Sequence, residues 1–281
     1  MQSLPVLPKS VRNVILLGGG LDTAVMLSTL ARNRHFPDAF VGLFVDYMQT
    51  AFHGEKHAVL AVVKHFGLNH CIGSVRVPMV DQVSAMVHGM NSGPDRFPLA
   101  HDGLPAEKGL NYYPARNLIL ASMAYSLADV VGAENIWTAV TGSTDVTAAD
   151  ELYPDTGRRF VGAIQTAGNI ATRRRIAVQA PLLGVSKREV VSMGQRLETP
   201  MGDTCSCLRG SFVDKPKNRP DYKGIVHCEL CISCITRKMA FINEKIPDPS
   251  YYDPECFGYR LPTLTEMAAE LAAERATNAQ Q

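Results

Sequence analysis

The feature of this chain that most restricts its fold is a repeated alternation of short apolar runs with helix-like segments. Alternating units of this kind build a parallel sheet that helices cover on both faces, with ligands at the carboxyl ends of the strands. The sequence therefore predicts an α/β fold with a Rossmann-like parallel sheet. The predicted strands are residues 13–17, 39–45, 71–77, 135–140 and 176–180, and the predicted helices are residues 55–66, 117–130 and 187–197.

Composition limits the partners of such a protein. With 281 residues and 46% hydrophobic content, the chain can bury a large core. A net charge of +1 argues against binding nucleic acid by bulk electrostatics. We interpret the arginine runs at 158–159 and 173–175 as a solvated face. No signal peptide or membrane span is recognisable, so we expect a cytoplasmic protein without a membrane partner.

A regular cysteine cluster marks the last third of the chain. Cys228, Cys231 and Cys234 form a C-x2-C-x2-C pattern, and Cys205 and Cys207 lie upstream in a Thr-Cys-Ser-Cys stretch. Zinc takes four thiolates at about 2.3 Å, which short loops from two segments can supply. The spacing therefore predicts one metal site rather than disulfides, because cytosolic thiols stay reduced. An iron–sulfur cluster is the alternative, although the ferredoxin-type run requires a further cysteine that this chain lacks.

A glycine-rich turn follows the first predicted strand. Gly18, Gly19 and Gly20 precede Asp22, Thr23 and an apolar-periodic stretch, which is typical of a strand, a loop and a helix start. Such a loop exposes backbone N–H groups at the positive end of a helix dipole, where phosphate binds well. A tight bend alone would also use glycine. The spacing matches neither a Walker loop nor a dinucleotide-binding loop.

Motifs spread over most of the chain carry a resemblance to a known superfamily. The loop at residues 18–23 is similar to the S-G-G-x-D-S loop of the PP-loop ATP pyrophosphatases, which cleave ATP to AMP and pyrophosphate. Within that superfamily the chain resembles the 7-cyano-7-deazaguanine synthase family of queuosine precursor synthesis. The matching motifs are Asp46-Tyr47-x-Gln49 with Glu55, Pro114-Ala115-Arg116-Asn117-Leu118, Tyr153-Pro154-Asp155 with Phe160, Ala180-Pro181-Leu182 with Ser186-Lys187-Arg188-Glu189, and Thr204-Cys205-Ser206-Cys207 with His227-Cys228-x2-Cys231-x2-Cys234 and Arg237.

The resemblance implies an activity and a set of site residues. The implied activity is the ATP-dependent conversion of 7-carboxy-7-deazaguanine and ammonia to 7-cyano-7-deazaguanine, through acyl-adenylate and amide intermediates. The implied cofactors are a structural zinc ion, Mg²⁺, and ATP as co-substrate. The implied residues are Gly18, Gly19, Gly20, Leu21, Asp22 and Thr23 for pyrophosphate, Asp22, Arg116 and Lys187 for catalysis, Tyr153, Asp155 and Phe160 for the substrate, and Cys207, Cys228, Cys231 and Cys234 for zinc.

Three departures from the family pattern concern the implied site. Gly18 replaces the loop serine, Thr156 stands where the family usually has cysteine, and the interval from Cys207 to Cys228 is longer than usual. These changes fit a divergent, synthase-like branch. They leave three alternatives open. One is a ligase, in anti-phage defence, that joins the deazaguanine acid to a protein amine, and the others are a tRNA-thiolating PP-loop enzyme and a zinc-stabilised nucleotide-binding protein.

The expected organisation has two parts. We expect a PP-loop nucleotide-binding domain over residues 1–200 and a zinc-binding segment with C-terminal helices over residues 201–281, including a terminal helix at 265–281. The expected assembly is a homodimer. Stretches without a clear pattern are predicted to be loops that border the active site; these are residues 91–111, 141–172 and 207–227.

Overall fold

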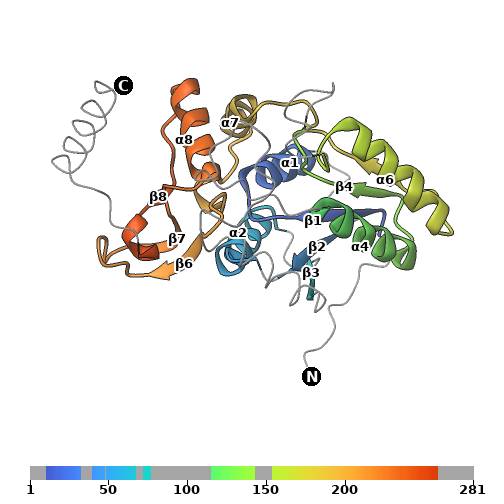
Figure 1. The fold of residues 1–281 in the computed structure, drawn as a ribbon, viewed down its shortest axis with the longest axis horizontal. Helices are drawn as coiled ribbons and strands as arrows, with labels where there is room; N and C mark the ends of the chain where they lie inside the picture. Colours follow the sequence, from blue (N-terminus) through green and yellow to red (C-terminus); the bar gives the residue numbers. More distant parts are fainter. Residues whose placement is uncertain are drawn as a thin grey trace, which may run out of the picture.

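A five-stranded parallel sheet forms the centre of the protein (Figure 1). The computed structural model describes residues 11–32, 40–47, 49–67, 72–76, 115–142 and 154–258. The strand order is β3-β2-β1-β4-β5, and every pairing is parallel. The predicted parallel α/β sheet is therefore confirmed. The strands are β1 Asn13–Leu17, β2 Phe40–Asp46, β3 Ile72–Arg76, β4 Asn135–Trp137 and β5 Ala177–Gln179.

Helices cover both faces of this sheet. Successive side chains of a strand point to opposite faces, and both faces of β1 and β2 are apolar. Ile15 and Phe44 pack against α1, α2, α7 and α8. Val14 and Leu43 pack against α4 and α6. The helices are α1 Leu21–Ala31, α2 Phe52–His65, α4 Arg116–Val131, α6 Arg158–Ala171, α7 Lys187–Arg196 and α8 Ile232–Glu244.

Helix α6 lies in a stretch that the sequence predicted to be a loop, so that prediction was wrong for residues 158–171. Only Ile164 and Gly168 of this helix are buried, which leaves a weak apolar signal. Its stability comes from a close approach to α4, since a Cβ atom at Gly168 would lie 2.3 Å from the Tyr125 ring. Tertiary packing thus overrides the low helix propensity of the segment.

A second, three-stranded sheet follows the parallel sheet in sequence and lies beside α2 in Figure 1. Its strands are β6 Ser211–Asp214, β7 Lys223–His227 and β8 Tyr251–Tyr252, with β6 antiparallel and β8 parallel to β7. The prediction of a loop over residues 207–227 was therefore wrong. The strands are short and surround a polar turn, and His57 of α2 stacks on Phe212 at 3.7 Å between ring centroids. The stretches 91–111 and 265–281 lie outside the described residues.

The arginine runs do not form one patch. Residues 158–159 begin α6 and residues 173–175 follow its end, so a helix of 14 residues separates them, which corresponds to about 20 Å. All five arginines are exposed. No helix in the described part of the chain combines the length and apolar character that crossing a membrane requires.

Candidate active site and metal centre

A cavity of about 510 Å³ opens at the carboxyl ends of β1, β2 and β4. Its walls come from the turn after β1, the segments after β2 and β4, the first residues of α4 and α7, the turn at residues 205–208, and α8. Thr141 and Thr156 also line it, so part of the stretch 141–172 does border the cavity. This is the edge of an open α/β sheet at which ligands bind.

The glycine turn forms the floor of the cavity. A Cβ atom at Gly19 would lie 2.5 Å from Cα of Glu55, so the close approach of α2 requires glycine there. A Cβ atom at Gly18 would meet only Oγ1 of Thr23, at an ordinary 3.4 Å. Gly20 is the N-cap of α1 and brings no side-chain acceptor. The first-turn N–H groups of α1 are therefore suited to an anion.

Asp22 and Lys187 meet beside this turn. Nζ of Lys187 donates to both carboxylate oxygens of Asp22 at 2.6 Å. Lys187 is the first residue of α7, whose start is fixed by a capping box between Ser186 and Glu189. Both side chains line the cavity and keep about a quarter to a third of their surface exposed. The structure therefore brings together a carboxylate and a cation that the sequence places 165 positions apart.

Arg116 also lines the cavity, within a polar cluster. The pKa of its guanidinium is raised, chiefly by Tyr47, to which it also hydrogen-bonds, and further by Glu55 and Asp155. Nε2 of Gln49 donates to Oε2 of Glu55 at 2.8 Å. Burial raises the pKa of the Glu55 carboxyl, and the Gln49 hydrogen bond and the Arg116 charge offset this only in part. The sequence indicated Glu55 as a motif residue but gave it no role.

The structure gives less direct support to the predicted substrate residues than to Asp22, Lys187 and Arg116. Asp155 is buried, and its Oδ2 accepts from the backbone N–H of Asn117 at 2.8 Å in the first turn of α4. It thereby caps a helix whose own N-cap, Ala115, provides no side-chain hydrogen bond. Phe160 packs against the apolar core under α4. Tyr153 lies outside the described residues. The substrate roles of all three stay predictions.

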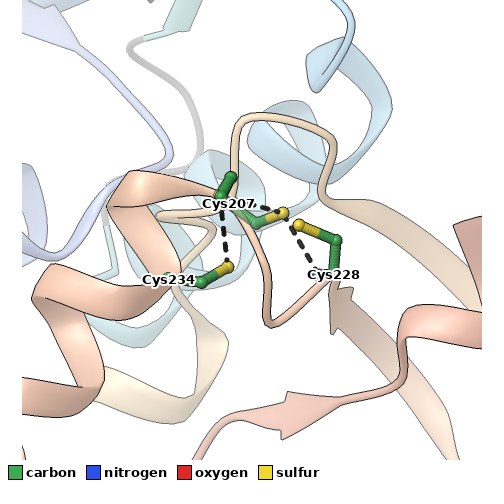
Figure 2. Close-up of side chains that lie close together, drawn as sticks. Cys207, Cys228 and Cys234 are labelled. Atoms are coloured by element: carbon green, nitrogen blue, oxygen red, sulfur yellow. Dashed lines mark hydrogen bonds between the residues drawn. The ribbon is translucent and has the colours of Figure 1, made fainter. Parts of the chain in front are cut away.

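Four cysteines converge in the C-terminal part. The sulfur atoms of Cys207, Cys228, Cys231 and Cys234 all lie within 4.8 Å of one another, and Figure 2 shows three of these side chains facing a common centre. Sγ of Cys231 is 3.4 Å from that of Cys234 and 3.9 Å from that of Cys207. Four sulfurs bound tetrahedrally to one ion at 2.3 Å would be about 3.8 Å apart. The cluster therefore fits a single metal ion.

The surroundings of the cluster also suit a metal-bound thiolate. Backbone N–H groups of Arg209 and Cys228 both donate to Sγ of Cys207 at 3.3 Å, and such bonds stabilise a ligand's charge. The hydrogen bond with Cys207 lowers the pKa of the Cys231 thiol below its usual range. Several irons would hold their thiolates on different atoms and hence farther apart. Cys205, the other candidate ligand, is instead buried against the apolar residues Ala51, Ala58 and Ile225.

One polar contact joins the metal-binding segment to the glycine turn, and a second set of contacts, made by Arg237, lies within the segment. The backbone N–H of Cys205 donates to the carbonyl of Gly19 at 2.6 Å. The fully buried Arg237 of α8 donates to Oγ1 of Thr204 at 2.7 Å and to the carbonyl of Met201 at 2.9 Å, and it pairs with Asp248 at 3.2 Å. From the sequence, Arg237 was recognised only as a motif residue. Its position one helical turn after Cys234, on the same face of the helix, could have indicated that it lies close to the cysteine cluster.

Comparison with known proteins identifies the family to which the chain belongs. The family described as "Queuosine biosynthesis protein QueC" matches residues 12–245. The chain belongs to the QueC family. Among curated relatives, a 7-cyano-7-deazaguanine synthase of Myxococcus xanthus is 31% identical over 86% of this chain and 97% of its own length. One from Ralstonia pickettii is 29% identical, over 86% and 98%, and one from Methanobrevibacter smithii is 27% identical, over 85% and 97%.

The QueC match spans the glycine turn, Arg116, Lys187 and the four clustered cysteines, so the cavity and the metal centre both belong to the family region. The predicted relationship is therefore confirmed, and this QueC protein belongs to a family of enzymes. A solved structure, "U34-tRNA thiolase NcsA from Methanococcus maripaludis with its [4Fe-4S] cluster", is similar with a TM-score of 0.34 and 12% identity, covering 74% of this chain and 64% of that chain. A similarity this weak carries no argument about cofactor or activity.

Proposed function

We propose that the protein is an ATP-dependent 7-cyano-7-deazaguanine synthase, which converts 7-carboxy-7-deazaguanine and ammonia to the nitrile through an acyl-adenylate and an amide. The observation that carries this proposal is the Asp22–Lys187 pair beside the glycine turn, in the cavity of a QueC family member. A carboxylate is a poor electrophile, and adenylation gives it AMP as a leaving group. The chain has no Walker lysine to manage a γ-phosphate.

In this proposal ATP is cut between its α- and β-phosphates. The backbone N–H groups at residues 18–23 hold the pyrophosphate, with the hydroxyl of Thr23 in place of the missing loop serine. Lys187 stabilises the charge that develops on the phosphates. Asp22 orients the ammonium group of Lys187 through its two hydrogen bonds, and it is the carboxylate placed to hold Mg²⁺. When bound, Mg²⁺ supplies further charge neutralisation on the phosphates.

The acid occupies the other side of the cavity. Arg116 provides the cation that binds and orients its carboxylate, because its guanidinium lies in the same polar cluster as Tyr47 and Glu55. The resemblance to the family supports Tyr153, Asp155 and Phe160 as substrate residues, with Asp155 accepting from the guanine-like edge of the acid. This arrangement places the carboxylate of the acid between Arg116 and the phosphate-binding turn.

The metal is proposed to be zinc with a structural role. Four thiolates close the coordination shell of zinc and leave no position for water or substrate. An ion held by Cys207, Cys228, Cys231 and Cys234 would then join the turn before β6, the end of β7 and the start of α8 within this part of the chain. The proposal includes a cytoplasmic location, because thiolates stay reduced in that compartment. It also includes a homodimer as the assembly.

The test is a product assay. Purified protein with the acid, ATP, Mg²⁺ and ammonia should release AMP, pyrophosphate and free nitrile, with two ATP consumed per nitrile, at about 1 s⁻¹ or more. Products are identified by mass spectrometry, and a reaction without the acid is the control. ADP and phosphate as sole products would contradict α–β cleavage. No nitrile, together with a protein that gains the mass of the acid less water, would instead identify the ligase.

A further inference from the structure

Glu55 is a cavity carboxyl to which the proposed function gives no task. It lines the cavity from the first turn of α2 and packs directly against Gly19 of the phosphate-binding turn. Arg116 is also near, because Glu55 helps to raise the pKa of its guanidinium. The residue therefore neighbours both places that the proposed function assigns to phosphate and to the acid.

The carboxyl is held in one position by its neighbours. Nε2 of Gln49 donates to Oε2 of Glu55 at 2.8 Å and to the carbonyl of Val45 at 3.3 Å, while Oε1 of Gln49 accepts from the N–H of Tyr47 at 3.0 Å. Gln49 thus ties the carboxyl to the end of β2. A single hydrogen bond to one oxygen leaves the carboxylate able to accept a further proton.

The proposed chemistry releases protons at this point. When ammonia attacks the acyl-adenylate, a C–N bond forms, the bond from carbon to the AMP oxygen breaks, and nitrogen must lose one proton. When the amide oxygen attacks a second ATP, pyrophosphate leaves and nitrogen loses another proton to give an imidate. When the imidate expels AMP, the nitrile forms and the last proton leaves. A positioned base contributes about 10²–10⁴-fold to such steps.

We propose that Glu55 is the catalytic base that takes these protons from the reacting nitrogen, and that Gln49 is its positioning residue. The inference rests on the proposed function and gives its amide- and nitrile-forming steps a proton acceptor. Each proton passes to solvent as AMP or pyrophosphate leaves, so that Glu55 is ready for the next step. Burial supports the assignment, because it makes this carboxylate a stronger base than an exposed glutamate.

The decisive variant is Glu55→Gln, which keeps the shape of the side chain and removes the base. ATP–pyrophosphate exchange with the acid should stay within about threefold of wild type, because adenylation needs no proton acceptor. Amide and nitrile formation from ammonia should fall by about 100-fold or more. Glu134→Gln is the matched control, since Glu134 is an exposed carboxylate paired with Arg12 outside the cavity.

A pH profile separates a base from a structural residue. Amide formation, expressed per unprotonated ammonia, should rise through one titration in wild type and lose that titration in Glu55→Gln. The other groups facing Glu55 are Arg116 of α4, Tyr47 after β2 and the thiol of Cys205. An equal loss of exchange and amide formation, or an unchanged nitrile rate, would overturn the assignment. A wild-type protein that forms neither amide nor nitrile would instead overturn the proposed function.

Discussion

The parallel-sheet body and the metal-binding part, residues 201–258, are stabilised in different ways. The body buries two large apolar clusters, one on each face of the sheet, with fully buried members such as Ile15 and Val14. The metal-binding part contains the cysteine cluster, and several of its buried side chains are polar, among them His227, Arg237 and Asp253. Its two small clusters contain few apolar residues.

This difference indicates where each part obtains its free energy of folding. Burial of apolar surface stabilises the body at about 25 cal/mol per Å². In the described residues of the metal-binding part, Met201, Ala240 and Phe241 pack into the core of the body, whereas the surroundings of the cysteines contain few apolar residues, so we expect an ion and a buried ion pair to contribute more there. Four changes break or sharpen this comparison, and they are ordered by the size of the expected effect.

Cys231→Ser should have the largest effect. A structural zinc site contributes about 10–16 kcal/mol in isolated metal-binding peptides, and losing one of four thiolates removes most of the ion's affinity. We expect elemental analysis to show loss of zinc, and limited proteolysis to cleave within β6, β7 or the start of α8. The parallel sheet should remain folded below the melting temperature of the variant. Full zinc content with unchanged melting would contradict the assignment.

The matched control for this change is Cys256→Ser. Cys256 is exposed and lies outside the cluster, although it follows β8 in the same part of the protein. We expect unchanged zinc content and melting temperature. A loss of zinc equal to that of Cys231→Ser would show that the cluster geometry does not define the ligands.

Arg237→Ala tests the buried ion pair. Its removal leaves Asp248 without its cationic partner in a site where only 12% of the aspartate side chain is exposed. Breaking such a pair costs about 3–5 kcal/mol, which urea unfolding would measure. Arg188→Ala, which removes an exposed partner of Glu244, should cost only a small fraction of that. Equal costs for the two variants would show that burial does not matter here.

Asp22→Asn should impair activity and leave stability almost unchanged. The pair with Lys187 is partly exposed, so its contribution to folding is small. Turnover of ATP to AMP should fall at least about tenfold, because the contact to the cation, and to a phosphate-bound metal, loses its charge. Asp214→Asn, in an exposed pair with Lys223, is the control and should keep full activity. Wild-type turnover by Asp22→Asn would remove this residue from the site.

Gly18→Ser should have the smallest effect, and it should be favourable. The new Cβ atom meets only Thr23 at 3.4 Å, and the hydroxyl restores one hydrogen bond to phosphate, which is worth about 0.5–1.5 kcal/mol. The KM for ATP should fall between about two- and tenfold. Gly19→Ser is the contrasting control, because its Cβ atom would collide with Glu55 at 2.5 Å. A higher KM in Gly18→Ser would show that the turn cannot use a serine.

The sequence predicted the body well because its signals are local. Apolar runs mark β1, β2, β4 and β5, and the three glycines mark the turn that forms the cavity floor. Helix α6 was not predicted because it depends on the contact of Gly168 with Tyr125 of α4, a helix that is distant in sequence but adjacent in the fold. Strands β6 and β7 were not predicted because each is short. Their positions depend on contacts with other elements, since β6 packs against α2 and β7 pairs with β8.

For the site, residue types could be predicted from the sequence, but the contacts between these residues could not. The regular spacing of three cysteines was enough to predict a metal site, and the structure brings the sulfur of Cys207 within 4.8 Å of the other three sulfurs. The pairing of Asp22 with Lys187, the position of Glu55 and the anchoring by Arg237 all depend on contacts across the fold. The roles of these residues in catalysis stay predictions.

The short hydrogen bond from the N–H of Cys205 to the carbonyl of Gly19 is the contact between the two parts that reaches the glycine turn itself. Coupling between two binding sites is reciprocal. If a bound ion raises the affinity of the glycine turn for phosphate by some factor, bound phosphate raises the affinity of the cysteine cluster for the ion by the same factor. A protein saturated with ATP should therefore keep its metal longer against a chelator. A metal-depleted protein should bind ATP more weakly, by the factor with which ATP strengthens metal binding. The affinity for ATP would then depend on whether the metal site is filled, and the affinity for the metal on whether ATP is bound.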